Sequence, residues 1–223
     1  MVGNTRKSAE FKADVVRECC AALESEGFIQ YRRGNVDLPL TANFHCWVGL
    51  NTRLTPEFVD INPFIGLHSV DIEKLWTSIK TGKYKTKYDR GLATYSVHFG
   101  TLLPNEPIFR FSIPSDIGRD ARRLAKIYAK EGVEFSRSIA SYESLLPYLL
   151  ERAPSLGGFP ERVASCLYFM NRYDEAEEFI TKVMTSQSDY FEGFATSFLR
   201  LPEFGGGGGI TVTQGDLLKS QPT

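Results

Sequence analysis

The stretch of sequence that decides the fold covers residues 28–67, FIQYRRGNVDLPLTANFHCWVGLNTRLTPEFVDINPFIGL. It divides into four short runs rich in β-branched and aromatic residues, at 28–33, 36–40, 43–51 and 57–67. Turn residues separate the runs, at Gly34-Asn35 and at 41–43. Because consecutive strands with short turns pair with one another, the stretch predicts an antiparallel meander.

Helical and strand patterns extend outward from this stretch. Apolar residues recur every three or four positions over residues 8–26, and Gly27 is placed to end that helix. Next come a helix over 69–80, expected to lie on the sheet, and strands over 92–103 and 108–113. Further helices are predicted over 116–132, 141–153, 160–171, 174–186 and 190–201. We therefore predict an α+β fold: an antiparallel sheet of about five to six strands packed with helices, then a helical C-terminal region.

The order of these elements predicts three parts. Residues 1–133 are expected to form the α+β sheet domain, residues 134–204 a helical region packed on it, and residues 205–223 a flexible tail. The tail begins with five consecutive glycines, which hold no fixed conformation without outside contacts. Residues 210–213 have the β propensity to add to a sheet edge of this or another protein, and a frayed terminus is the alternative.

Composition favours a globular protein, with 223 residues of which 42% are hydrophobic and 24% charged. No stretch approaches the roughly 18 consecutive apolar residues of a membrane span, and the first residues are polar, so a cytoplasmic protein with no membrane contact is expected. No CxxC spacing indicates zinc or a redox pair. We expect reduced, mostly buried thiols at Cys19, Cys20, Cys46 and Cys166.

Charge is distributed unevenly along the chain. Residues 1–133 carry 19 Lys and Arg against 15 Asp and Glu, whereas residues 134–223 carry 7 against 12. Such a difference is compatible with two faces that meet different partners, although the basic excess is smaller than that of a dedicated nucleic-acid binder.

The commonest enzyme signatures are missing from the sequence: it has no GxxxxGK[ST], GxGxxG, HExxH or GxSxG motif. Three histidines, His45, His68 and His98, lie within or at the end of predicted strands. Asp60 or Glu57 could orient an imidazole or join a metal shell, so a metal-dependent hydrolase is one alternative. Unrelated strand histidines are the more frequent case, and we assign no catalytic residue, metal or cofactor.

Two segments have the composition of an anion-binding surface. Residues 80–90 combine five cations with two tyrosines, and the helix over 116–132 places its cations opposite its apolar side. Solvated basic faces are more common than nucleic-acid contacts, so this interpretation is an alternative. Its candidate residues are Lys83, Lys85, Lys87, Arg90, Arg119, Arg122, Arg123 and Lys126.

Residues 164–186 contain the most patterned helical segment. A helix ends, a short turn follows, and Asp174 can cap the next helix with Glu177 as its partner, while the small Ala176 permits close helix crossing. The run Asn171-Arg-Tyr-Asp-Glu-Ala176 resembles one helical hairpin of a tetratricopeptide repeat. No second copy follows at a 34-residue period, so a single hairpin is expected and a repeat array is not.

A broader resemblance covers the order of elements: a helix, the pair Gly27-Phe28, a meander containing His45-Cys-Trp47, the run INPFIGLH at 61–68 and a closing helical region. This order resembles small bacterial α/β proteins associated with toxin immunity or antiviral defence. The resemblance implies a role in stoichiometric protein binding, with no catalytic residues to carry over.

The leading hypothesis is a protein-interaction module, such as an immunity, antitoxin or defence accessory protein, whose partner is another protein such as a toxin or effector. An enzyme is the less expected alternative. The acidic helical third is expected to present the partner surface, because aromatic anchors ringed by charge are typical of such faces. The candidate contacts are Tyr173, Glu175, Glu178 and Tyr190.

Overall fold

The computed structural model describes residues 2–55, 57–79, 88–105, 109–112, 116–155, 158–186 and 191–204, with side chains from residue 9 on except that of Ser186. The chain forms two compact units: unit 1 comprises Met1–His68 and Arg90–Ala140, and unit 2 comprises Ser69–Asp89 and Ser141–Thr223. This division differs from the predicted boundary after residue 133. The tail at 205–223, including the predicted strand segment, lies outside the described residues.

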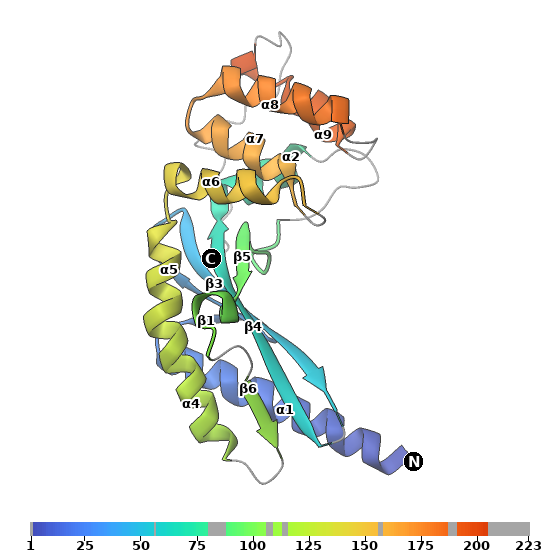
Figure 1. Cartoon of the computed structure of the whole chain (residues 1–223), viewed down its shortest axis with the longest axis vertical. Helices are drawn as coiled ribbons and strands as arrows, with labels where there is room; N and C mark the ends of the chain where they lie inside the picture. Colours follow the sequence, from blue (N-terminus) through green and yellow to red (C-terminus); the bar gives the residue numbers. More distant parts are fainter. Residues whose placement is uncertain are drawn as a thin grey trace, which may run out of the picture. The chain divides into compact units, whose positions relative to one another are not determined.

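Unit 1 contains a six-stranded antiparallel sheet (Figure 1). Its strands are β1 (Ile29–Arg32), β2 (Asn35–Pro39), β3 (Phe44–Leu54), β4 (Phe58–Ser69), β5 (Tyr95–His98) and β6 (Phe109–Ser112). They follow the order β1-β2-β3-β4-β5, and β6 also pairs with β4. The predicted meander and strand number are therefore confirmed.

Two glycines make the turns around β1 possible. Gly27 has a φ of 92° and lies two residues after the last residue of α1 (Val2–Ser25), while Gly34 has a φ of 78° between β1 and β2. A side chain with a Cβ is strained in this left-handed region, so glycine suits both positions. The predicted end of the first helix at Gly27 is confirmed.

Three helices pack on one face of the sheet (Figure 1). They are α1, α4 (Ile117–Ile127) and α5 (Val133–Ser138), and a π-helical turn at Tyr128–Gly132 joins the last two. Alternate residues of β2 and β3 face these helices, which buries them. The core includes Val15, Cys19, Leu23, Val36, Cys46, Val48, Phe111, Ala121 and Leu124. All four cysteines are free and buried.

The predicted strand over 92–103 is shorter in the structure. β5 ends at His98, and the chain then forms the short helix α3 (Phe99–Leu102). His98 has extended backbone, and its Nδ1 accepts a hydrogen bond from the Gly100 amide at 3.0 Å. The side chain thus caps the helix, and this local bond ends the alternation that the sequence pattern continued to Leu103.

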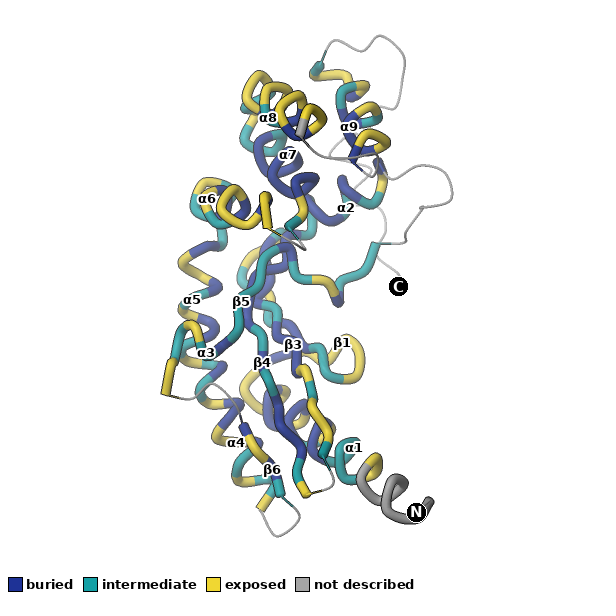
Figure 2. The backbone as a smooth tube through the Cα atoms, turned by 45° about the vertical axis from the view of Figure 1, so that its right-hand side comes forward, coloured by how far each residue is buried: buried dark blue, intermediate teal, exposed yellow. Residues whose placement is uncertain are grey.

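Unit 2 is helical. Its helices are α2 (Val70–Ile79), α6 (Tyr142–Arg152), α7 (Pro160–Phe169), α8 (Tyr173–Ser186) and α9 (Glu192–Phe198), followed by a 3₁₀ turn at Pro202–Phe204. α7 is the central helix: it contacts α2, α6 and α8, and its residues from Pro160 to Leu167 are buried (Figure 2). α2, which was predicted to lie on the sheet, packs against α7 and α9 within unit 2.

The predicted hairpin over 164–186 corresponds to α7 and α8. Asn171 between them has a φ of 57°, which asparagine tolerates better than most residues. α8 begins at Tyr173, so Asp174 lies in its first turn and not before it as predicted. Ala176 is fully buried, in agreement with the predicted close helix crossing. No helix in the described ranges is long and apolar enough to cross a membrane.

Candidate functional site

A polar cluster of Asp37, His45 and Arg90 lies on the sheet face that points away from the unit 1 core. Leu38 pairs with Cys46 across β2 and β3 and both pack toward the core, so the neighbouring Asp37 and His45 point to the other face. Arg90 Nε lies 2.5 Å from Asp37 Oδ2, and its Nη2 lies 2.9 Å from Oδ1. His45 Nδ1 lies 3.3 Å from the same Oδ2. The Asp37 carboxylate is therefore shared by a guanidinium and an imidazole.

Burial and hydrogen bonding act in opposite directions on Asp37. Burial by itself raises the pKa of this carboxyl group, but hydrogen bonds from His45 and Arg90 and the positive charge of Arg90 lower it more. The net result is a pKa below the ordinary value of 3.8. Asp37 is thus a charged group held in place by its partners, which makes it a poor general base near neutral pH.

Hydrogen bonds hold the segment that follows Arg90 against the same sheet face. The carbonyl oxygen of Gly91 accepts hydrogen bonds from Trp47 Nε1 at 3.0 Å and from Arg32 Nη2 at 3.1 Å. The carbonyl oxygen of Leu92 accepts one from His68 Nδ1 at 2.6 Å. Together with the Arg90–Asp37 pair, these bonds fix the end of the predicted basic loop, and Lys83, Lys85 and Lys87 in that loop lie outside the described residues.

The structure brings two of the three histidines together. The ring centroids of His45 and His68 are 6.1 Å apart, whereas His98 bonds to Asn62 Oδ1 and caps α3. Asp60, which the sequence suggested could orient an imidazole or join a metal shell, instead accepts hydrogen bonds of 2.7 and 3.0 Å from Arg110. In the part of the chain that the structure describes, no three His, Cys, Asp or Glu residues are grouped to hold a metal ion.

Unit 2 contains a second buried ion pair. Arg162 Nε lies 2.8 Å from Glu73 Oε1, and only 8% of the arginine side chain and 2% of the glutamate side chain are exposed. The guanidinium lies 4.4 Å from the ring centroid of Phe159 and 5.6 Å from that of Trp76. This pair joins α2 to α7 in the interior, which gives it a structural role.

α4 carries the predicted basic residues on its exposed side. Arg119, Arg122, Arg123 and Lys126 are all exposed. Arg119 Nε lies 3.2 Å from Asp120 Oδ1, and Arg123 lies over the Phe109 ring at 5.6 Å. Arg122 and Lys126 form no ion pair or hydrogen bond with a described residue. We call these four residues the α4 stripe.

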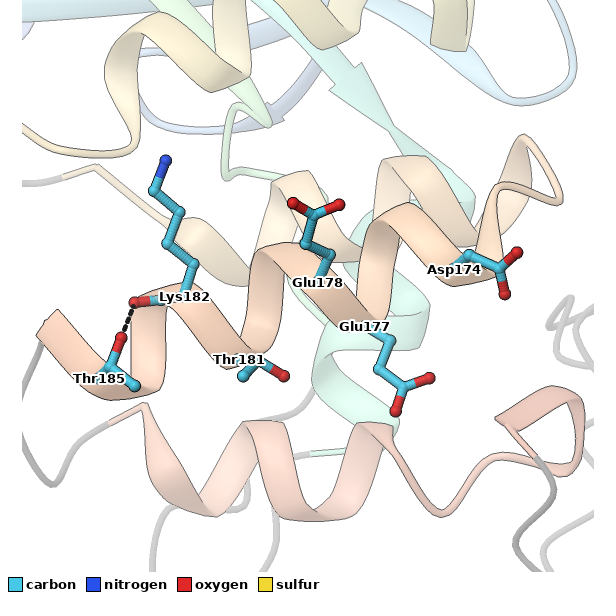
Figure 3. Close-up of a pocket in the computed structure, with 6 residues that line it drawn as sticks. All are labelled: Asp174, Glu177, Glu178, Thr181, Lys182 and Thr185. Carbon is cyan, nitrogen blue, oxygen red and sulfur yellow. Dashed lines mark hydrogen bonds between the residues drawn. The ribbon is translucent and has the colours of Figure 1, made fainter.

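α8 carries an acidic surface whose residues are spaced along the helix much as the basic residues of α4 are (Figure 3). Six of its side chains line a hollow of about 570 Å³ and project away from the helix: Asp174, Glu177, Glu178, Thr181, Lys182 and Thr185. All six are exposed, and the other side of α8 buries Ala176, Ile180 and Val183. We call Asp174, Glu177 and Glu178 the α8 stripe.

The residues predicted as protein contacts are placed differently from one another. Glu178 belongs to the α8 stripe, but Glu175 is bonded to Arg172, which lowers the pKa of that glutamate. Tyr173 is half-buried, with its ring 5.6 Å from Tyr168. Tyr190 lies outside the described residues.

Sequence reasoning used Asp174 and Glu177 only as helix-capping residues and did not consider them as surface residues. Their spacing from Glu178, together with the buried positions of Ala176 and Ile180, was the signal that could have placed them on the exposed side.

Comparison of the chain with protein-family models, with curated proteins and with solved structures found no match in any of the three.

Proposed function

We propose that this chain is a protein-interaction module that binds another protein stoichiometrically, as immunity, antitoxin and defence accessory proteins do, and that the α8 stripe is the partner surface. The supporting observation is that Asp174, Glu177 and Glu178 are exposed beside a hollow and form no ion pair or hydrogen bond with a described residue. The same surface carries one cation, Lys182, so its three carboxylates leave a net charge of −2 (three negative charges and one positive) that a cationic partner would neutralise.

The charge of the stripe favours a partner with a cationic surface. A surface with Lys or Arg side chains would meet these carboxylates, whose main contribution is to steer the encounter and raise the association rate. Affinity requires apolar contact as well. Met184, with 40% of its surface exposed, lies on the same helix and can supply such contact.

The proposal is tested first by site-specific photo-crosslinking. A photoreactive residue at Thr181, within the hollow, should give a 1:1 crosslinked product with one partner, while the same residue at Glu151 on the exposed side of α6 should not. The partner is then purified for kinetic measurements. Equal crosslinking from both positions would contradict a partner surface on α8.

The kinetic test compares two variants of equal net charge. Glu177→Lys with Glu178→Lys should slow association at least about tenfold at low salt, and the difference should shrink as salt screens the charges. Glu143→Lys with Glu151→Lys, two exposed positions on α6, is the control and should change the rate less than about twofold. An unchanged association rate in the α8 variant would refute the proposal.

A further inference from the structure

The α4 stripe is a second charged surface, and the core of unit 1 fixes its orientation. Ala121, Leu124 and Ala125 are buried in that core on one side of α4. The stripe residues at positions 119, 122, 123 and 126 follow the i, i+3, i+4, i+7 spacing of a single helix face. The four cations therefore point away from the core together.

Acidic residues on α4 neutralise little of this charge. Asp120 is the acidic residue within the helix, and it lies beside Arg119. Asp116 before the helix accepts a hydrogen bond from the Arg119 amide at 3.0 Å, so it serves as the N-cap. Arg122, within the stripe, and Lys126, at its end, have no described acidic partner.

We propose that the α4 stripe binds the phosphate backbone of double-stranded DNA. From residue 119 to residue 126 the helix rises by about 10 Å, at about 1.5 Å per residue. Phosphates along one strand rise by about 3.4 Å each along the duplex axis and lie about 7 Å apart in space, so the cations of the stripe can reach about three phosphates. α4 contains no aromatic residue, IGRDARRLAKI, and it thus lacks the stacking groups that single-stranded nucleic acids require.

The electrostatic contribution to the free energy of binding favours a polyphosphate partner over an acidic protein surface. An exposed ion pair between two proteins contributes about 0 to 1 kcal/mol. DNA instead carries a condensed layer of counterions, and each phosphate that a cation neutralises releases counterions with a gain in entropy. A row of exposed cations therefore gains more from DNA than from carboxylates.

The test is fluorescence anisotropy of the full chain with a labelled 20-base-pair DNA duplex of mixed sequence between 50 and 200 mM salt. Binding should be weak and independent of sequence, with a slope of log K against log salt of about −3, from about three phosphate contacts. In Arg122→Glu with Lys126→Glu, affinity at low salt should fall at least about tenfold and the slope should flatten by about 2. The substitution Arg122→Gln with Lys126→Gln should give an intermediate loss.

The matched control is Arg33→Glu with Arg53→Glu, which makes the same change in net charge at two exposed positions of unit 1 off α4. It should reduce affinity less than about threefold. Equal losses in the control and the α4 variant would refute the proposal, as would tighter binding of single-stranded RNA or polyglutamate than of duplex DNA. Glu177→Lys with Glu178→Lys should leave DNA binding intact, so this proposal and the proposed function can fail independently.

Discussion

The two units bury charge in different ways. Each holds an ion pair of arginine and carboxylate: in unit 1 Arg90 donates hydrogen bonds to both oxygens of Asp37, and in unit 2 Arg162 donates one to Glu73 through Nη2. The Arg90 side chain is 31% exposed, so water also solvates its guanidinium group, whereas the Arg162 side chain is only 8% exposed. The arginine of unit 2 therefore depends on its carboxylate partner much more than the arginine of unit 1 does.

The two charged stripes differ in another respect. Both lie on amphipathic helices with closely similar spacing, yet the α4 stripe is cationic and the α8 stripe is anionic. The buried side of each helix determines which positions are exposed. It does not determine the sign of the charge there, because water solvates either sign at little cost to stability. The sign is therefore free to suit a partner, which is the basis of both proposals.

The largest expected effect follows from removal of Arg162. Arg162→Met should lower the free energy of unfolding by about 3 to 5 kcal/mol, because Glu73 would remain charged in the interior without its partner. Denaturant unfolding of a Trp47→Phe background, with Trp76 as the reporter in unit 2, measures this loss. The double variant Glu73→Gln with Arg162→Met should recover much of the stability. A loss below about 1 kcal/mol in the single variant would show that the pair is solvated.

A smaller effect is expected from the pair in unit 1. Asp37→Asn keeps the shape of the side chain but removes its charge, and it should cost about 2 kcal/mol because water can reach the unpaired Arg90. Trp47, bonded to the same segment through Gly91, is the reporter in a Trp76→Phe background. A loss equal to that of Arg162→Met would remove the contrast between the units.

Low pH should weaken the contact between Asp37 and Arg90. The pKa of Asp37 is lower in the folded chain than its ordinary value of 3.8, so its contribution to stability is present above about pH 4 and is lost as pH falls through the folded pKa. The difference in stability between the natural chain and Asp37→Asn should therefore be larger at about pH 5 than at pH 2.5 and should shrink below about pH 4. Urea unfolding at each pH measures it, and a difference that persists at pH 2.5 would contradict the assignment.

Much of the sheet could be predicted from local pattern. Alternation and Gly34 place β1 to β4, because side-chain period and turn residues are local properties. The end of β5 was not predicted, since the cap formed by His98 depends on its own hydrogen bond with Gly100 and leaves the apolar alternation unchanged. Local pattern therefore located the strands better than their ends.

In the candidate sites, too, the features set by local pattern were predicted and those set by long-range contacts were not. The exposed side of α4 was predicted, and so was part of the α8 stripe, because helical spacing assigns each residue to one side. The contact between Asp37 and Arg90 spans 53 positions and depends on the register of β2 and β3 and on the path of the chain at Gly91. No local pattern encodes such a contact, so Arg90 was interpreted as an anion-binding residue.

The smallest expected effect concerns Arg172, which follows α7 and bonds to Glu175. Their side chains are 38% and 54% exposed, so the pair has the same chemistry as Arg162 with Glu73 but remains in water. Water already stabilises each charge, and holding two long side chains together costs rotamer entropy, so Arg172→Ala should leave the midpoint of unfolding almost unchanged. Denaturant unfolding beside Arg162→Met, with the same Trp76 reporter, compares two arginines of one unit that differ mainly in burial. A shift of the midpoint as large as that of Arg162→Met would mean that burial is not what separates the two pairs.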